Sequence, residues 1–122
     1  MTVQALLAAL GALSGLLGVA LSAMARHREG LQYLETVAQF LLFHAPALFG
    51  LAALLAVGVA QPRIGAAAGI ALVIGLALFC GDLAARDFLS GPLFPMAAPT
   101  GGTLLMIGWL LIGIAALWPK RP

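Results

Sequence analysis

Apolar segments of membrane-spanning length, separated by short polar stretches, dominate this sequence. The first, residues 3–25, carries no charged side chain, and the third, residues 64–85, carries only Asp82. About 20 consecutive apolar residues suffice for a helix to cross the hydrocarbon core of a bilayer. Inside that core every backbone N–H and C=O group needs a partner within the protein, which leaves only helices or a closed barrel.

The residue pattern excludes the barrel. Barrel strands alternate polar and apolar residues, whereas these segments are apolar on all sides. Only 8% of the 122 residues are charged, where soluble domains carry about 25%. The sequence therefore predicts an all-α, polytopic membrane protein with one domain, residues 1–122. We expect four transmembrane helices, at about residues 3–25, 36–60, 64–85 and 101–118, in an antiparallel bundle.

The first segment is expected to be a retained helix and not a cleaved signal peptide. No basic residue precedes Arg26, and the segment exceeds the roughly 15 residues of a signal-peptide core. Four spans place both termini on one side of the membrane. Basic residues in short loops favour the cytoplasm, and the C-terminal basic pair tips the prediction towards cytoplasmic termini. The count itself is balanced, with Arg63, Lys120 and Arg121 against Arg26, Arg28 and Arg86.

His44 lies inside the second segment, two residues before Pro46. A neutral imidazole there has one donor and one acceptor to satisfy. Intramembrane ionisable residues often serve as proton relays or ligand contacts. In the alternative, His44 is structural and bonds a neighbouring helix or the carbonyl of Leu42, which Pro46 deprives of its helical partner. The structural interpretation is favoured.

Asp82, about one turn before the end of the third segment, has two candidate partners. A couple with His44 would join a carboxylate to an imidazole in the membrane. Arg86 follows Asp82 by four residues on the same helix face. This second pairing needs no match in membrane depth, and it is the one we expect.

The remaining candidate polar residues have simpler expected roles. Glu35 is expected to cap or charge the start of the second helix, where an acid favours the helix dipole. His27, between two arginines, is expected to be exposed, and Cys80 to behave as a small apolar residue. No catalytic motif appears, and two histidines on separate segments are too few for a metal site. The sequence thus predicts no enzyme, cofactor or metal site, and the scattered charges predict no nucleic-acid partner.

Glycines recur at four-residue and similar spacings in two of the segments. Small residues at such spacing let helix backbones approach closely. Packing within the chain is favoured, and self-association or contact with other membrane-protein subunits is the alternative. The glycines concerned are Gly11, Gly15, Gly18, Gly65 and Gly69.

Four blocks in series resemble a known family. They are GALSGLLGVALSAMARH at residues 11–27, Leu34-Glu35 with FLLFHAPAL at 40–48, FCGDL at 79–83, and APTGG at 98–102 with Gly108-Trp109. In this order and spacing they are similar to the small bacterial inner-membrane proteins of the YgdD and YwdK type, domain-of-unknown-function family 423. The resemblance implies a four-helix, multi-pass protein of the bacterial inner membrane. It implies no assigned activity.

Two functions remain open from the sequence. Short loops and glycine-rich faces favour an accessory, assembly or scaffold component of a membrane complex. The alternative is a small transporter or channel-like protein that uses His44 and Asp82, the only histidine and the only acidic residue within the predicted spans. For both functions, the lipid bilayer is an expected partner of the protein.

Overall fold

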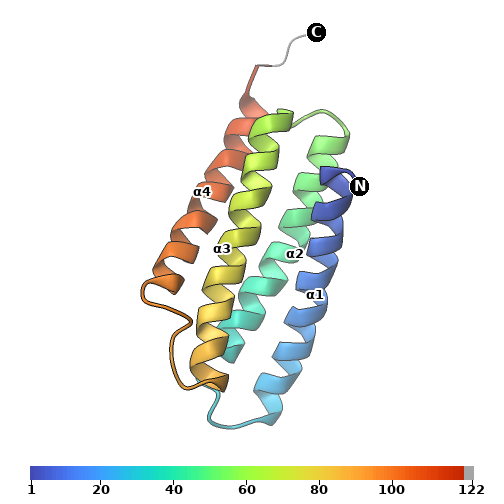
Figure 1. Ribbon diagram of the computed structural model, residues 1–122. Coiled ribbons are helices and arrows are strands. Elements are labelled where there is room, and N and C mark those ends of the chain that lie inside the picture. Colours follow the sequence, from blue (N-terminus) through green and yellow to red (C-terminus); the bar gives the residue numbers. More distant parts are fainter. Residues whose placement is uncertain (120–122) are drawn as a thin grey trace.

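The computed structural model describes residues 1–119, and within this range it contains four long helices and no strand (Figure 1). Each helix is long and apolar enough to cross a membrane. The predicted all-α, multi-pass class is therefore confirmed. The helices are α1 (Val3–His27), α2 (Leu34–Ala56), α3 (Pro62–Phe88) and α4 (Ala97–Leu117).

Consecutive helices run antiparallel, so the start of α1 and the end of α4 lie at the same end of the molecule (Figure 1). We call this the terminal end; it also holds the α2–α3 connection, residues 57–61. The opposite end holds the connections 28–33 and 89–96. We call it the acidic end, because Glu29, Glu35, Asp82 and Asp87 all lie on or towards it.

The helices pack as two close pairs, α1 with α2 and α3 with α4. The two pairs meet mainly through a smaller contact between α2 and α3. The tightest contact is between the backbones of α3 and α4. A Cβ atom added to Gly101 would lie 2.5 Å from the backbone nitrogen of Phe79 and 2.7 Å from the carbonyl oxygen of Gly75. Only glycine fits there, so α3 and α4 approach as closely as their backbones allow.

The five glycines singled out in the sequence all face other helices or neighbouring side chains of the same chain. On α1, an added Cβ would meet α2, at Ala45 from Gly11 and Gly15 and at Leu42 from Gly18. On α3, an added Cβ would meet Leu55 from Gly65, and Leu7 of α1 together with Leu51 of α2 from Gly69. Packing within the chain uses these positions, and their use in self-association stays a prediction.

Helix boundaries shift by up to four residues from the expected ones, and three of the shifts have a clear local reason. α2 ends at Ala56, shortly before Gly58, whose φ of +79° favours glycine. α3 begins at Pro62, after the Gln61 side chain caps it by accepting the N–H of Ile64 at 2.7 Å. α4 begins at Ala97 and not near residue 101, because a proline such as Pro99 is tolerated in a first turn, where its missing N–H costs nothing.

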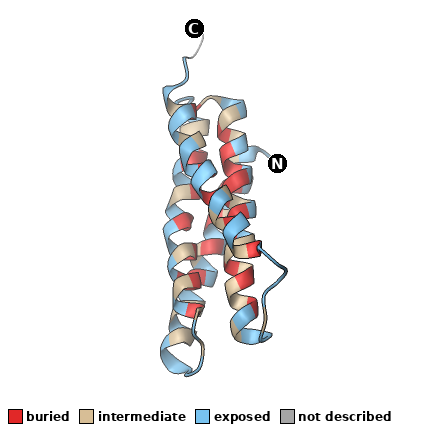
Figure 2. Ribbon diagram, turned by 90° about the vertical axis from the view of Figure 1, so that its left-hand side faces the viewer, coloured by how far each residue is buried: buried red, intermediate tan, exposed pale blue. Residues whose placement is uncertain are grey.

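Figure 2 colours the ribbon by burial, and buried residues occur on all four helices where these face one another. The largest fully buried residues are leucines, including Leu34, Leu48, Leu51 and Leu72. The outside is also apolar, with Leu16 67% and Met106 68% exposed. Apolar surface of this extent suits contact with lipid and not with water.

Candidate functional site

His44 of α2 is buried and has a partner for each ring nitrogen. Its Nδ1 donates to the carbonyl oxygen of Phe40 at 2.7 Å, and its Nε2 accepts the indole N–H of Trp109 at 3.2 Å. A carbonyl only accepts and an indole N–H only donates, so the imidazole is neutral with its proton on Nδ1. The structural interpretation predicted a bond to a neighbouring helix, and α4 supplies it. The carbonyl used is that of Phe40 and not that of Leu42.

Aromatic rings surround this imidazole. The Phe40 ring stacks on His44 with centroids 6.0 Å apart, and the Phe79 ring lies 4.4 Å from Phe40. The Trp109 ring is tilted against His44 at 5.7 Å. They border an open cavity of about 650 Å³, the His44 groove, lined by Phe40, His44, Phe79, Ala98, Pro99, Gly102, Thr103, Leu105, Met106 and Trp109.

The hydrogen-bonded pair His44 and Trp109 lies near the middle of the membrane span. His44 follows Leu34, the first residue of α2, by ten residues, which is about 15 Å along the helix. An indole N–H at that depth needs an acceptor, which the hydrocarbon lacks. His44 supplies it across 65 residues of sequence. Sequence reasoning missed this pairing; the only signal was a tryptophan in mid-span, away from the membrane interface where it usually anchors.

Asp82 of α3 is completely buried and accepts two hydrogen bonds. Its Oδ2 accepts from Arg86 Nε at 3.1 Å, which confirms the predicted pairing along the helix. Its Oδ1 accepts the backbone N–H of Leu93 at 2.8 Å and so ties the α3–α4 connection to α3. The structure does not bring Asp82 and His44 together by a hydrogen bond, because each has other partners.

Asp87, five residues beyond Asp82 on α3, performs a similar task for the other connection. Its two carboxylate oxygens each accept a backbone N–H at 2.9 Å, from Gln32 and Tyr33. Tyr33 is the N-cap residue of α2 and offers no side-chain cap of its own. Asp87 therefore caps α2 from α3. The sequence held one hint of this, since no Ser, Thr, Asp or Asn precedes α2 to cap it locally.

The other polar residues divide between the surface and the interior. Glu35 is exposed in the first turn of α2, where its charge favours the helix dipole. His27 is exposed as the last residue of α1. Cys80 is buried, with its Sγ 3.9 Å from the carbonyl oxygen of Val37. Ser14, also buried, donates to the carbonyl oxygen of Leu41 at 2.6 Å and so joins α1 to α2.

These bonds account for the buried polar groups. Within residues 1–119, every buried side-chain nitrogen or oxygen has a hydrogen-bond partner. The same range contains no group of three His, Cys, Asp or Glu side chains that could hold a metal ion. These hydrogen bonds fasten the connections 28–33 and 89–96 to α3, and they join α4 to α2.

Comparisons with known proteins identify relatives that are also membrane proteins. The family model described as "Protein of unknown function (DUF423)" matches residues 7–102. A UPF0382 membrane protein of Haemophilus influenzae is 31% identical over 119 residues, which cover 89% of this chain and 91% of the relative. The UPF0382 membrane protein YwdK of Bacillus subtilis is 32% identical over 115 residues, which cover 88% and 93%. No solved structure matches. With its helices, its block pattern and these relatives in agreement, the chain belongs to the DUF423 family of membrane proteins.

Proposed function

We propose that the protein is a non-enzymatic accessory or scaffold subunit that assembles with other proteins of the bacterial inner membrane. The observation that carries this proposal is the use of its polar groups. Every buried side-chain nitrogen or oxygen in residues 1–119 is bonded within the chain. A catalytic or transporting group must exchange partners with a substrate, whereas His44 and Asp82 are committed to holding α4 and a connection in place.

The outer face of α4 is the surface that best suits a partner helix. Around Gly113 an added Cβ would meet nothing within 4 Å, so the position is open to the outside. Trp109, Leu110 and Leu117 beside it are exposed. The face is hollowed by a cavity of about 460 Å³. A glycine at such a place lets the backbone of a second helix approach closely and gain packing that lipid does not provide.

A photo-crosslinking experiment in native membranes tests the proposal. A photoreactive amino acid at position 110 replaces Leu110, and the matched control replaces Leu16, an equally exposed leucine on α1. We expect a discrete protein adduct from position 110, lost in Gly113→Leu, and only lipid adducts from position 16. Lipid adducts alone from both positions, with a lone monomer in native mass spectra from mild detergent, would contradict the proposal.

The proposal includes an orientation, with the terminal end in the cytoplasm. It is supported by Arg63, the second residue of α3, and by the basic pair that follows α4 in the sequence. Reporter fusions to the C-terminus check it. An active periplasmic reporter and an inactive cytoplasmic one would reverse the assignment.

A small transporter or channel-like protein is the second candidate. The His44 groove favours it, because this open cavity of about 650 Å³ reaches an ionisable ring in mid-membrane. Asp82 is less suitable, since both of its oxygens are bonded and it is completely buried. Ion flux into proteoliposomes that is lost in both His44→Ala and Asp82→Ala would favour transport over the accessory role. Flux that is absent, or unchanged in both variants, removes this candidate.

A further inference from the structure

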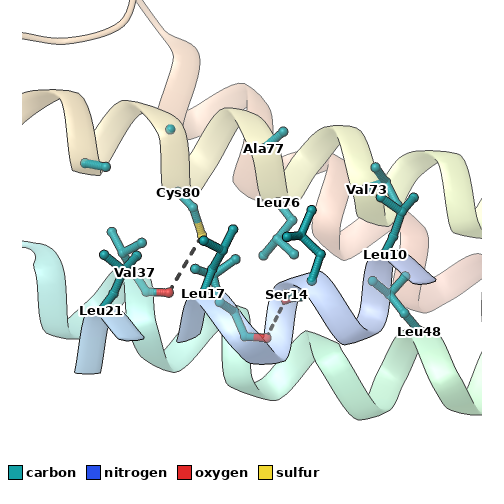
Figure 3. Close-up of a pocket in the computed structure, with 14 residues that line it drawn as sticks. Leu10, Ser14, Leu17, Leu21, Val37, Leu48, Val73, Leu76, Ala77 and Cys80 are labelled. Carbon is teal, nitrogen blue, oxygen red and sulfur yellow. Dashed lines mark hydrogen bonds between the residues drawn. The ribbon is translucent and has the colours of Figure 1, made fainter. Parts of the chain in front are cut away.

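A long apolar groove runs between α1 and α3, which touch each other only slightly. It consists of two cavities that share Leu10 and Val73. The one towards the acidic end has a volume of about 290 Å³, and Figure 3 shows leucine side chains of α1, α2 and α3 around it. The one towards the terminal end has a volume of about 380 Å³. We call the two together the α1/α3 groove.

The lining of this groove offers nothing polar to an occupant. Its two side chains with polar atoms are Ser14 and Cys80, and both direct these atoms to carbonyl oxygens of α2 (Figure 3). The remaining lining side chains are apolar. In a bilayer, such a groove is filled by another apolar chain, because water finds no hydrogen-bond partner there.

The length and continuity of the groove suit a lipid chain. The two cavities together extend along α1 from Val3 to Leu21, about 27 Å. An acyl chain is flexible enough to follow a continuous apolar groove of this length, and the bilayer supplies it at this surface.

The positive charge of Arg63 at the terminal end suggests that the lipid has an anionic headgroup. Arg63 of α3 is exposed and precedes Ala66 and Ile70, which line the groove, by three and seven residues. Residues at these spacings share one helix face, so Arg63 lies on the face that the groove follows. The acids of the sequence lie on or towards the opposite end of the molecule. The terminal end of the groove therefore carries a cationic side chain, and within residues 1–119 no Asp or Glu lies at that end.

We propose that the α1/α3 groove binds an anionic phospholipid, with one acyl chain between α1 and α3 and the headgroup phosphate on Arg63. A guanidinium pairs with phosphate oxygens through two parallel hydrogen bonds. The bound lipid replaces the packing contacts that α1 and α3 do not make with each other. This inference does not depend on the accessory role, which concerns α4.

Native mass spectrometry of the full chain tests the proposal, with phosphatidylglycerol and phosphatidylcholine added to detergent-solubilised protein. We expect phosphatidylglycerol to bind at least fivefold more tightly than phosphatidylcholine. Arg63→Gln, a surface change, is expected to remove that preference. Ala66→Phe, which narrows the groove, is expected to reduce the binding of both lipids. Arg28→Gln is the matched control, because Arg28 is also exposed but lies at the acidic end.

Three results would overturn the proposal. Equal binding of the two lipids, or a preference for phosphatidylglycerol that survives Arg63→Gln, removes the assigned headgroup site. Binding of both lipids that Ala66→Phe leaves unchanged removes the groove as the acyl-chain site. A dimer mass that replaces the lipid adduct and disappears in Ala66→Phe means that a second copy of the chain occupies the groove. Circular dichroism of each variant establishes that its helices are intact.

Discussion

The acidic end and the middle of the bundle both contain polar side chains bonded within the protein, but these bonds join different parts of the chain. At the acidic end, Asp82 and Asp87 accept backbone N–H groups from the two connections. In the middle, His44 bonds one carbonyl of its own helix and one side chain of α4. The carboxylates therefore fasten the connections between helices, whereas the imidazole joins α2 to α4 through the Trp109 side chain.

The two regions also differ in the strength of their bonds. A hydrogen bond to a charged acceptor contributes about 1.5–3 kcal/mol. A neutral bond between membrane helices contributes about 0.6 kcal/mol, because the separated helices also find partners. Although His44 is the more conspicuous residue in the sequence, we expect the carboxylates to contribute more to stability.

Replacing Asp82 should have the largest effect. Asp82→Ala leaves the N–H of Leu93 without its acceptor and Arg86 without its partner. Since Asp82 is completely buried but Arg86 is 40% exposed, we expect a loss of about 3 kcal/mol in the free energy of unfolding. Chemical unfolding in detergent micelles measures it. Glu35→Ala, an exposed acid at the same end, is the control, and an equal loss in both variants would refute the special role of Asp82.

Replacing Asp87 should have the next largest effect. Asp87→Ala removes the acceptor of the Gln32 and Tyr33 N–H groups, and we expect a loss of about 1–2 kcal/mol, as for other helix caps. Hydrogen exchange should accelerate at these two amides. Glu29→Ala, which changes an exposed acid in the same connection, should leave their exchange unchanged. Unchanged exchange in Asp87→Ala would show that α2 is capped in another way.

The smallest expected effect is the coupling between His44 and Trp109. A double-mutant cycle with His44→Ala and Trp109→Phe should give an interaction free energy of about 0.6 kcal/mol. Phenylalanine keeps an aromatic ring but removes the indole N–H. Unfolding of the two single variants and the double variant in micelles measures the coupling. A coupling as large as the loss in Asp82→Ala would reverse the ranking of the two regions.

The parts of the site that sequence reasoning predicted are local. Arg86 follows Asp82 by four residues, so helix geometry alone brings them together. Asp87 and Tyr33 are 54 residues apart, and His44 and Trp109 are 65 apart. No periodicity within one helix indicates such pairs, because they depend on how helices are rotated and matched in depth. The approach of Gly75 to Gly101 was missed for the same reason.

By itself, the sequence determined the number and kind of the membrane spans and their antiparallel order. The physical reason is that a bilayer forces each apolar segment to satisfy its backbone internally, which makes helix formation a local matter. Only the tertiary structure decided that α1 packs on α2 and α3 on α4, that a groove stays open between α1 and α3, and that Trp109 meets His44. These features depend on how side-chain shapes and hydrogen-bond donors and acceptors match across helices. Hydrophobicity alone does not specify this matching, because lipid outside the bundle is nearly as apolar as the core.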